Sequence, residues 1–133
     1  LLTTPIFYVN AKPHLGHAFS LLLTDAFTRW HRLRNPLKQV ILSTGTDEHG
    51  QKVLYQFLGL TSHYLPQIHR VAMEKGVSSQ QWCDSISEEF KSLAKTLNIA
   101  PDHRFIRTTS PSHRETVLNL WVILQDNYTG FHF

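Results

Sequence analysis

A chain of 133 residues with 41% apolar residues can bury one modest hydrophobic core, so we expect one domain or part of one. The formal charge of +3 is mild and the basic residues are scattered, so composition alone gives no argument for nucleic-acid binding. The single cysteine, Cys83, excludes an internal disulfide, and no apolar run approaches the roughly 18 to 20 residues that a membrane helix requires.

The first segment, Leu1 to Val9, is rich in β-branched and aromatic residues and predicts a strand. Residues Asn10 to Pro13 form a turn into a helix that runs to about Arg34, where Asn35-Pro36 stops it. Apolar residues recur in this helix with the spacing of one helical face. We expect that face to be buried: Leu15, Ala18, Phe19, Leu22, Ala26, Phe27, Trp30 and Leu33.

The next apolar run, Gln39 to Ser43, is bounded by turn signals and predicts a second buried strand. Strand, helix and strand then make one βαβ unit with a right-handed crossover, which places the carboxyl ends of both strands at one edge. The segment TGTDEHG, Thr44 to Gly50, should leave the second strand at that edge, and a further helix should begin near Glu48.

Residues 54–69 are apolar without clean periodicity, so we expect a helix tail followed by a loop. A short turn of helix should follow from Arg70 to Gly76. Ser78, with Gln81 three residues later, forms a capping-box pattern at the start of a long helix. The apolar stripe of this helix should be buried: Trp82, Ile86, Phe90, Leu93 and Leu97.

A third short strand is expected at Phe105 to Thr108. The last helix should begin with Ser110 as its N-cap and Pro111 in its first turn. Its apolar residues are expected to face inward: Val117, Leu118, Trp121 and Leu124. We find no internal repeat.

Two histidines, His14 and His17, lie three residues apart at the opening turn of the first helix, next to unpaired backbone donors and the positive end of the helix dipole. Neutral imidazoles there can donate hydrogen bonds to phosphate oxygens as charge accumulates on them. Gly16 lacks a Cβ, so a flat group such as a purine could lie against the backbone. Because the chain has no Walker-type lysine loop, the pattern favours nucleotidyl transfer at an α-phosphate. The spacing is equally compatible with histidines that only cap or pack.

Asp47 stands at the carboxyl end of the second strand, where ligands bind in open α/β sheets. Its carboxylate suits a substrate ammonium group, or alternatively caps the following helix. We expect Glu48 to be a solvated acid of a first helical turn and His49 to be structural. Five further histidines show no grouping typical of metal ligands, namely His63, His69, His103, His113 and His132. No protein-bound metal is therefore predicted.

Together, TTPIFYVNAKPHLGH and STGTDEHGQK closely resemble the N-terminal part of methionyl-tRNA synthetases, which are class I aminoacyl-tRNA synthetases, in their bacterial and mitochondrial type. HLGH matches the first signature of that family, and TGTDEHG matches the stretch that separates methionyl enzymes from leucyl, isoleucyl and valyl relatives. The resemblance continues through VAMEKGVSSQQWCDSISEEFKSL and FIRTT. It implies an α/β fold: a Rossmann-like parallel sheet with flanking helices, with residues 1–133 forming part of a catalytic domain.

The resemblance also implies an activity, methionine–tRNA ligation: ATP-dependent activation of methionine to methionyl-adenylate and its transfer to tRNA(Met), with Mg²⁺ accompanying ATP. His14 and His17 would stabilise the pentavalent α-phosphate, and Gly16 and Asn10 would help to seat the nucleotide. On the methionine side, Asp47 would hold the ammonium group. Ile6 and Tyr8 would line the same site. The expected location is the mitochondrial matrix, or the cytoplasm if the chain is bacterial.

The chain departs from the family pattern at residues 54–69, which look like an insertion, and after Asp126, where TGFHF looks like a foreign ending. It lacks the family's connective insertion, aromatic methionine pocket, Lys-Met-Ser-Lys-Ser loop and anticodon-binding helices. We therefore expect an N-terminal piece that neither completes the reaction nor binds tRNA alone, because the lysine loop supplies much of the transition-state electrostatics.

Two other interpretations remain open. Small free-standing nucleotidylyltransferases also use a histidine pair on a strand-to-helix turn, and the length favours that class, although TGTDEHG argues against it. Alternatively, the chain is a non-catalytic truncated product of altered splicing, which the insertion and the unusual ending favour.

Overall fold

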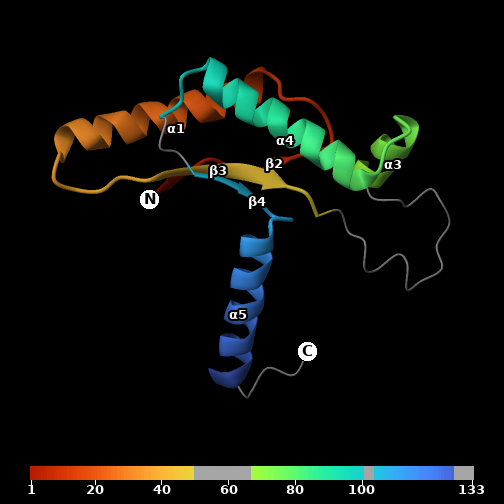
Figure 1. Ribbon diagram of the computed structural model, residues 1–133. Coiled ribbons are helices and arrows are strands. Elements are labelled where there is room, and N and C mark those ends of the chain that lie inside the picture. The colour runs from red at the N-terminus through yellow and green to blue at the C-terminus, as the bar shows by residue number, and fades with distance from the viewer. Residues whose placement is uncertain (50–66, 101–103, 128–133) are drawn as a thin grey trace.

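A computed structural model of the chain describes residues 1–49, 67–100 and 104–127 (Figure 1). The elements follow the order β1 (Leu2–Thr3), β2 (Phe7–Tyr8), α1 (Leu15–Arg34), β3 (Leu42–Asp47), α3 (Gln67–Glu74), α4 (Ser79–Thr96), β4 (Arg104–Arg107) and α5 (Pro111–Asn127). The helix expected to begin near residue 48, most of the expected insertion at 54–69 and the last six residues lie outside the described residues.

The strands form one parallel sheet in which β3 is central. β1 and β2 both pair with one side of β3, and β4 pairs with the other. β1 and β2 are two pieces of the single strand expected at 1–9, and Pro5, which has no N–H to donate, lies in the gap between them. This arrangement confirms the predicted parallel α/β fold.

The bounds predicted for the second strand were wrong. It was expected at 39–43, but β3 runs from Leu42 to Asp47 and therefore contains most of the TGTDEHG segment. The hydroxyl groups of its two threonines are buried and have partners far away in the sequence: Thr44 Oγ1 lies 2.7 Å from Thr4 Oγ1, and Thr46 Oγ1 lies 3.0 Å from Ser87 Oγ. Polar residues can therefore form this buried strand without leaving unpaired groups.

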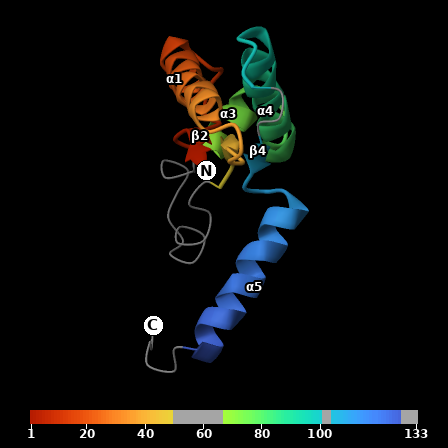
Figure 2. The ribbon, with the colours of Figure 1, turned by 90° about the vertical axis from the view of Figure 1, so that its left-hand side faces the viewer.

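The helices α1 and α4 lie side by side on one face of the sheet, as two views at right angles show (Figures 1 and 2). Together with the sheet and α3 they enclose the core: Phe7, Val9, Leu21, Leu42, Ile68, Cys83, Ile86, Phe90, Ala94 and Ile99. The capping box at α4 is confirmed, since Ser78 Oγ accepts from Gln81 N at 3.2 Å and Gln81 Oε1 accepts from Ser78 N at 2.9 Å. The buried stripe predicted for α4 is confirmed as well, with Ile86 and Phe90 fully buried.

The face predicted to be buried on α1 was wrong. The buried residues are Ala18, Leu21, Asp25 and Thr28, whereas the predicted stripe, apart from Ala18, is exposed. Asp25 tolerates burial because Arg29 Nε donates to its carboxylate at 2.7 Å and Ala100 N donates at 2.9 Å. The bond from Ala100 ties α1 to the segment that precedes β4, and so does a bond from Arg29 Nη2 to the carbonyl oxygen of Asn98 at 2.7 Å.

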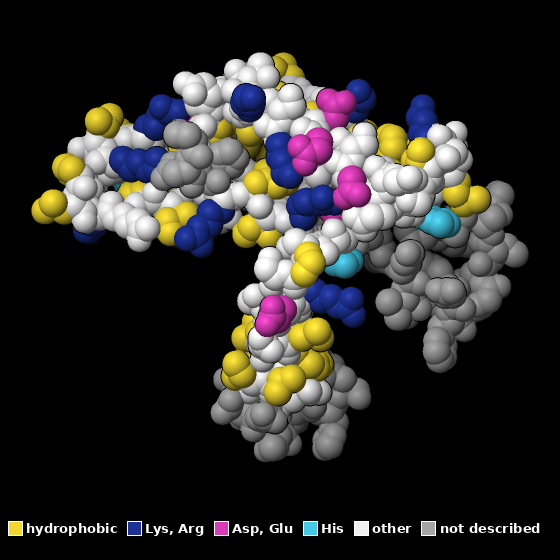
Figure 3. Space-filling view, in the orientation of Figure 1, with side chains coloured by type: hydrophobic (Ala, Val, Ile, Leu, Met, Phe, Trp, Pro, Cys, Tyr) yellow, Lys and Arg dark blue, Asp and Glu magenta, His cyan; other side chains and the backbone are white. Residues whose placement is uncertain are grey.

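The inward face predicted for α5 was also wrong. The helix begins as expected, with Ser110 Oγ accepting from His113 N, but it projects away from the other helices (Figures 1 and 2). Its large apolar side chains have 42% to 55% of their surface exposed. Figure 3 shows several of them in yellow on the part of α5 that projects from the rest of the molecule. No helix in the described part of the chain is long and apolar enough to cross a membrane.

Gly45, in the middle of β3, is required by the close approach of β4. A Cβ built on Gly45 would lie 2.0 Å from the carbonyl oxygen of Ile106, its register partner on β4. Since this neighbour is backbone that takes part in the sheet, it cannot move aside without disturbing the pairing of β3 with β4.

We therefore expect Gly45→Ala to lower the free energy of unfolding by roughly 3 kcal/mol, the upper end of overpacking effects. Gly76→Ala is the matched control, because nothing lies within 4 Å of its added Cβ and only its positive φ of 69° opposes the change. Chemical denaturation measures both costs, and amide hydrogen exchange should show faster exchange in β4 for Gly45→Ala alone. Unchanged β4 protection in the Gly45 variant would contradict the proposed close approach.

Candidate functional site

The two histidines of HLGH cap helix α1. His14 is the N-cap, and its Nδ1 accepts a hydrogen bond from Gly16 N at 3.1 Å. His17 reaches back, and its Nδ1 accepts from His14 N at 3.0 Å. The amides of Gly16 and His17 are therefore already occupied by His14, which corrects the expectation that these backbone donors are unpaired.

These bonds determine the tautomer of both rings. A backbone N–H can only donate, so each Nδ1 must carry a lone pair, and a neutral imidazole then bears its proton on Nε2. The ring centroids of His14 and His17 lie 3.9 Å apart, and His17 also packs edge-on against Phe7 and Phe90. Burial, followed by the neighbouring His14, lowers the pKa of His17 below its ordinary value of 6.5, which favours the neutral ring at pH 7.

Gly16 provides the space that the His14 ring occupies. A Cβ on Gly16 would lie 3.0 Å from Cε1 and 3.1 Å from Nδ1 of that ring, which is tighter than ordinary van der Waals contact. A side chain at this position would therefore push the His14 ring away from the helix terminus. The absence of a Cβ thus serves the histidine cap, and the purine contact expected for Gly16 remains a prediction.

Two of the residues expected on the methionine side, Tyr8 and Asp47, come together at the carboxyl ends of β2 and β3. Tyr8 is the register partner of Asp47, and burial together with the charge of Asp47 raises the pKa of Tyr8. Asp47 Oδ1 accepts from His49 N at 3.1 Å, so Asp47 caps the backbone turn that follows β3. Ile6, in the gap between β1 and β2, has 52% of its surface exposed, and Asn10 is half-buried.

The backbone of β2 joins the histidine pair to this second group. Phe7 packs against the ring of His17, and the next residue, Tyr8, pairs with Asp47. The structure thus brings His14, His17, Tyr8 and Asp47 to neighbouring positions near the carboxyl ends of two parallel strands, whereas Ile6 lies before the start of β2. This is the edge at which open α/β sheets bind ligands.

Glu48 was predicted to be solvated, and this was wrong. Its side chain is completely buried, and Arg107 Nε donates to it at 2.7 Å. Burial alone would raise the pKa of Glu48, but hydrogen bonds from Arg107, Ser87, Thr109 and Thr46 outweigh it and hold that pKa below its ordinary value. Glu48 is therefore a buried carboxylate that is paired with Arg107.

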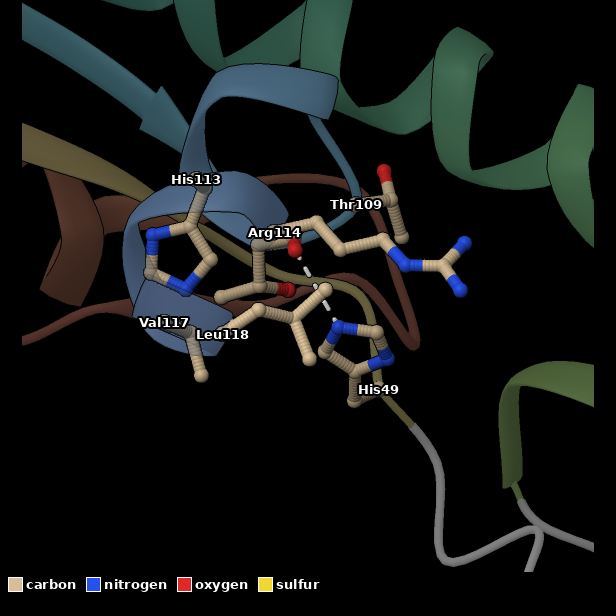
Figure 4. Close-up of a pocket in the computed structure, with 7 residues that line it drawn as sticks. His49, Thr109, His113, Arg114, Val117 and Leu118 are labelled. Atoms are coloured by element: carbon tan, nitrogen blue, oxygen red, sulfur yellow. Dashed lines mark hydrogen bonds between the residues drawn. The ribbon is translucent and has the colours of Figure 1, made fainter. Parts of the chain in front are cut away.

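A pocket of about 430 Å³ lies beside this ion pair, between the end of β3 and the first turns of α5 (Figure 4). The histidine expected to be structural, His49, lines it, and its Nε2 lies 3.1 Å from the carbonyl oxygen of Thr108. The other lining residues are Thr108, Thr109, His113, Arg114, Val117 and Leu118. The pocket therefore adjoins the methionine-side residues through His49.

Sequence reasoning missed Arg107, Thr108 and Thr109 as members of this edge. Arg107 ends β4, and Thr108 and Thr109 directly follow it. Because the carboxyl ends of parallel strands meet at one edge, their position could have indicated them. The FIRTT segment was interpreted only as a short strand and as part of the family resemblance, with no role at the site. Across the described residues, no group of three or more His, Cys, Asp or Glu side chains is arranged to hold a metal ion.

A parallel sheet flanked by helices, with a capped helix opening directly after its first strand, defines a Rossmann-like α/β domain. The family described as "tRNA synthetases class I (M)" matches residues 1–129. The chain therefore belongs to that family, as the resemblance of HLGH and TGTDEHG indicated.

Individual relatives agree with this assignment. A Schizosaccharomyces pombe protein named "Probable methionine--tRNA ligase, mitochondrial" is 48% identical over 93% of this chain. The mitochondrial methionine–tRNA ligase of Bos taurus is 42% identical over 98% of the chain, and the methionine–tRNA ligase of Rickettsia felis is 40% identical over 98%. The chain spans 20%, 20% and 23% of the length of these three relatives.

The tautomers of the two histidines can be measured directly. We expect ¹⁵N chemical shifts above pH 6.5 to show His14 and His17 protonated at Nε2 and unprotonated at Nδ1, because both Nδ1 atoms accept backbone hydrogen bonds. His17 should titrate below 6.5. Because its folded pKa is depressed, its contribution to stability is present above 6.5 and is lost as the pH falls through the folded value. An Nδ1-protonated His17 would contradict the capping geometry.

Proposed function

We propose that this chain is the part of a methionine–tRNA ligase that holds ATP and methionine for the formation of methionyl-adenylate. The observation that carries the proposal is the arrangement of the histidine cap of α1 beside a strand that ends in Asp47, in a chain of the class I synthetase family. The complete activity, which includes transfer of methionine to tRNA(Met), belongs to this proposal.

His14 and His17 are proposed to act on the α-phosphate of ATP. The methionine carboxylate attacks the α-phosphorus, the bond to the bridging oxygen breaks, and pyrophosphate leaves. Negative charge builds on the equatorial oxygens in the transition state, and the two Nε2–H groups can donate hydrogen bonds to them. Gly16 and Asn10 are proposed to help seat the nucleotide. Mg²⁺ is proposed to enter as a complex with ATP.

Asp47 is proposed to bind the ammonium group of methionine. A carboxylate at this position gives a charge-assisted hydrogen bond of the strong kind, and it orients the amino acid so that its carboxylate faces the phosphate. Tyr8, the register partner of Asp47, and Ile6 are proposed to line the same side of the amino acid. We place the protein in the mitochondrial matrix, by analogy with the mitochondrial relatives, and its bacterial relatives make the bacterial cytoplasm the alternative.

Methionine-dependent ATP–pyrophosphate exchange tests catalysis by this chain alone. We expect no exchange above background, because the chain contains no counterpart of the lysine loop that the family resemblance implies. Robust exchange that is abolished by His17→Ala would overturn this expectation. Adenylylation of a phosphorylated cofactor precursor without any effect of methionine would instead favour a small nucleotidylyltransferase.

Binding tests the two halves of the site separately. We expect His17→Gln to weaken Mg-ATP binding about tenfold or more while it preserves folding, because Gln at this helix position can still accept from His14 N. Asp47→Asn should weaken methionine binding by a similar factor and leave Mg-ATP binding unchanged. Glu115→Gln, an exposed acid on α5, is the matched control. Titration calorimetry measures each affinity, and equal ATP affinity in wild type and His17→Gln would leave the histidines with a capping role only.

A further inference from the structure

The carboxylate of Glu48 is held by five hydrogen bonds from four side chains in the described part of the chain. Oε1 accepts from Thr46 Oγ1 at 2.9 Å, Ser87 Oγ at 2.6 Å and Arg107 Nε at 2.7 Å. Oε2 accepts from Arg107 Nη2 at 3.0 Å and from Thr109 Oγ1. The donors come from β3, α4, β4 and the segment before α5, so one buried carboxylate joins four parts of the chain.

This saturation distinguishes Glu48 from the adjacent acid. A carboxylate offers about four lone-pair sites, and the five donors around Glu48 occupy them all. The Asp47 carboxylate, by contrast, accepts one hydrogen bond within the described residues, from His49 N. Of the two neighbouring acids, Asp47 therefore retains the acceptor capacity for a ligand.

Thr108, which lies between the carboxylate partners Arg107 and Thr109, contacts the backbone on both sides of Asp47. On one side, Thr108 N donates to Thr46 O at 3.2 Å. On the other, Glu48 N donates to Thr108 Oγ1 at 2.9 Å, and His49 Nε2 lies 3.1 Å from Thr108 O. Asp47 thus lies between two residues that are both attached to the chain that follows β4.

Arg107 neutralises the negative charge of the buried Glu48 carboxylate. It bonds both oxygens of Glu48, and its Nη2 also donates to Asp84 on α4. Its hydrogen bonds to Glu48 and Asp84 raise the pKa of Arg107, so it remains charged. A buried carboxylate without this partner would repel the neighbouring Asp47 and favour its own protonation.

We propose that Glu48 is a positioning residue for methionine: through Arg107, Thr108, Thr109 and Ser87 it fixes the end of β3 so that Asp47 presents its carboxylate to the substrate ammonium group. This inference rests on the proposed function for the role of Asp47. Glu48 itself touches no substrate, and its effect is transmitted through the backbone of residues 47–49.

The test is Glu48→Gln, which keeps the size of the side chain but removes its charge, so that the fixed set of donors no longer matches it. We expect methionine binding to weaken roughly tenfold or more, because small displacements of a binding group are costly, while Mg-ATP binding at the histidine cap stays unchanged. Glu88→Gln on α4, an exposed acid, is the matched control and should change neither affinity.

A second, milder variant keeps the inference testable if Glu48→Gln does not fold. Thr108→Val removes the hydroxyl that accepts from Glu48 N and leaves the carboxylate with its five donors. It should weaken methionine binding less than Glu48→Gln does and again leave Mg-ATP binding unchanged. The folded fraction of each variant is measured by circular dichroism, so that affinities refer to folded protein.

A readout without ligand separates this inference from the proposed function. The amide of His49, which donates to Asp47 Oδ1, should lose its hydrogen-bonded NMR chemical shift and its exchange protection in both variants. This change supports positioning even if the wild-type chain binds no methionine, a result that would count against the proposed function. An unchanged His49 amide and unchanged methionine affinity would overturn the inference, as would a parallel loss of both affinities, which indicates a purely structural role.

Discussion

Every strand in the described part of the chain pairs with β3, so the position of this strand fixes the position of the others. Two local constraints make that possible. Gly45 lets the backbone of β4 approach, and the buried hydroxyls of Thr44 and Thr46 find partners on neighbouring segments. The candidate site depends on the same strand, because β3 ends in Asp47 and places Tyr8 opposite it.

The bounds of β3 were predicted incorrectly because the polar residues of this strand depend on partners that lie far away in the sequence. The apolar run at 39–43 carries the usual signal of a buried strand, whereas LSTGTD contains the residue types of a turn. Threonine is well suited to a strand, but its burial requires a hydroxyl partner. The partner of Thr44 is Thr4, forty residues earlier, and the partner of Thr46 is Ser87 on α4. Local periodicity contains no information on such distant pairs.

The helices show a related limit. The periodicity of α4 predicted its buried stripe because its apolar residues meet the sheet directly. On α1 the apolar face is exposed and the buried face contains Asp25, whose burial depends on Arg29 and on the amide of Ala100. On α5 the apolar residues surround much of the helix, so no single face is defined. An apolar pattern identifies a surface that favours burial, but it does not identify the segment that covers it.

At the candidate site, the sequence pattern does not distinguish the surroundings of adjacent residues. Asp47 and Glu48 are adjacent acids with the same chemistry. Donors from α4, β4 and the segment before α5 surround the buried Glu48 carboxylate, whereas the Asp47 carboxylate keeps acceptor sites for a ligand. For the two histidines, two roles that were considered as alternatives are compatible with each other. Capping was an alternative to phosphate binding, yet the hydrogen bonds that cap α1 occupy both Nδ1 atoms and so place both ring protons on Nε2. A cap of this kind therefore prepares the donors that the proposed chemistry requires, and the structural role and the proposed functional role depend on the same two bonds.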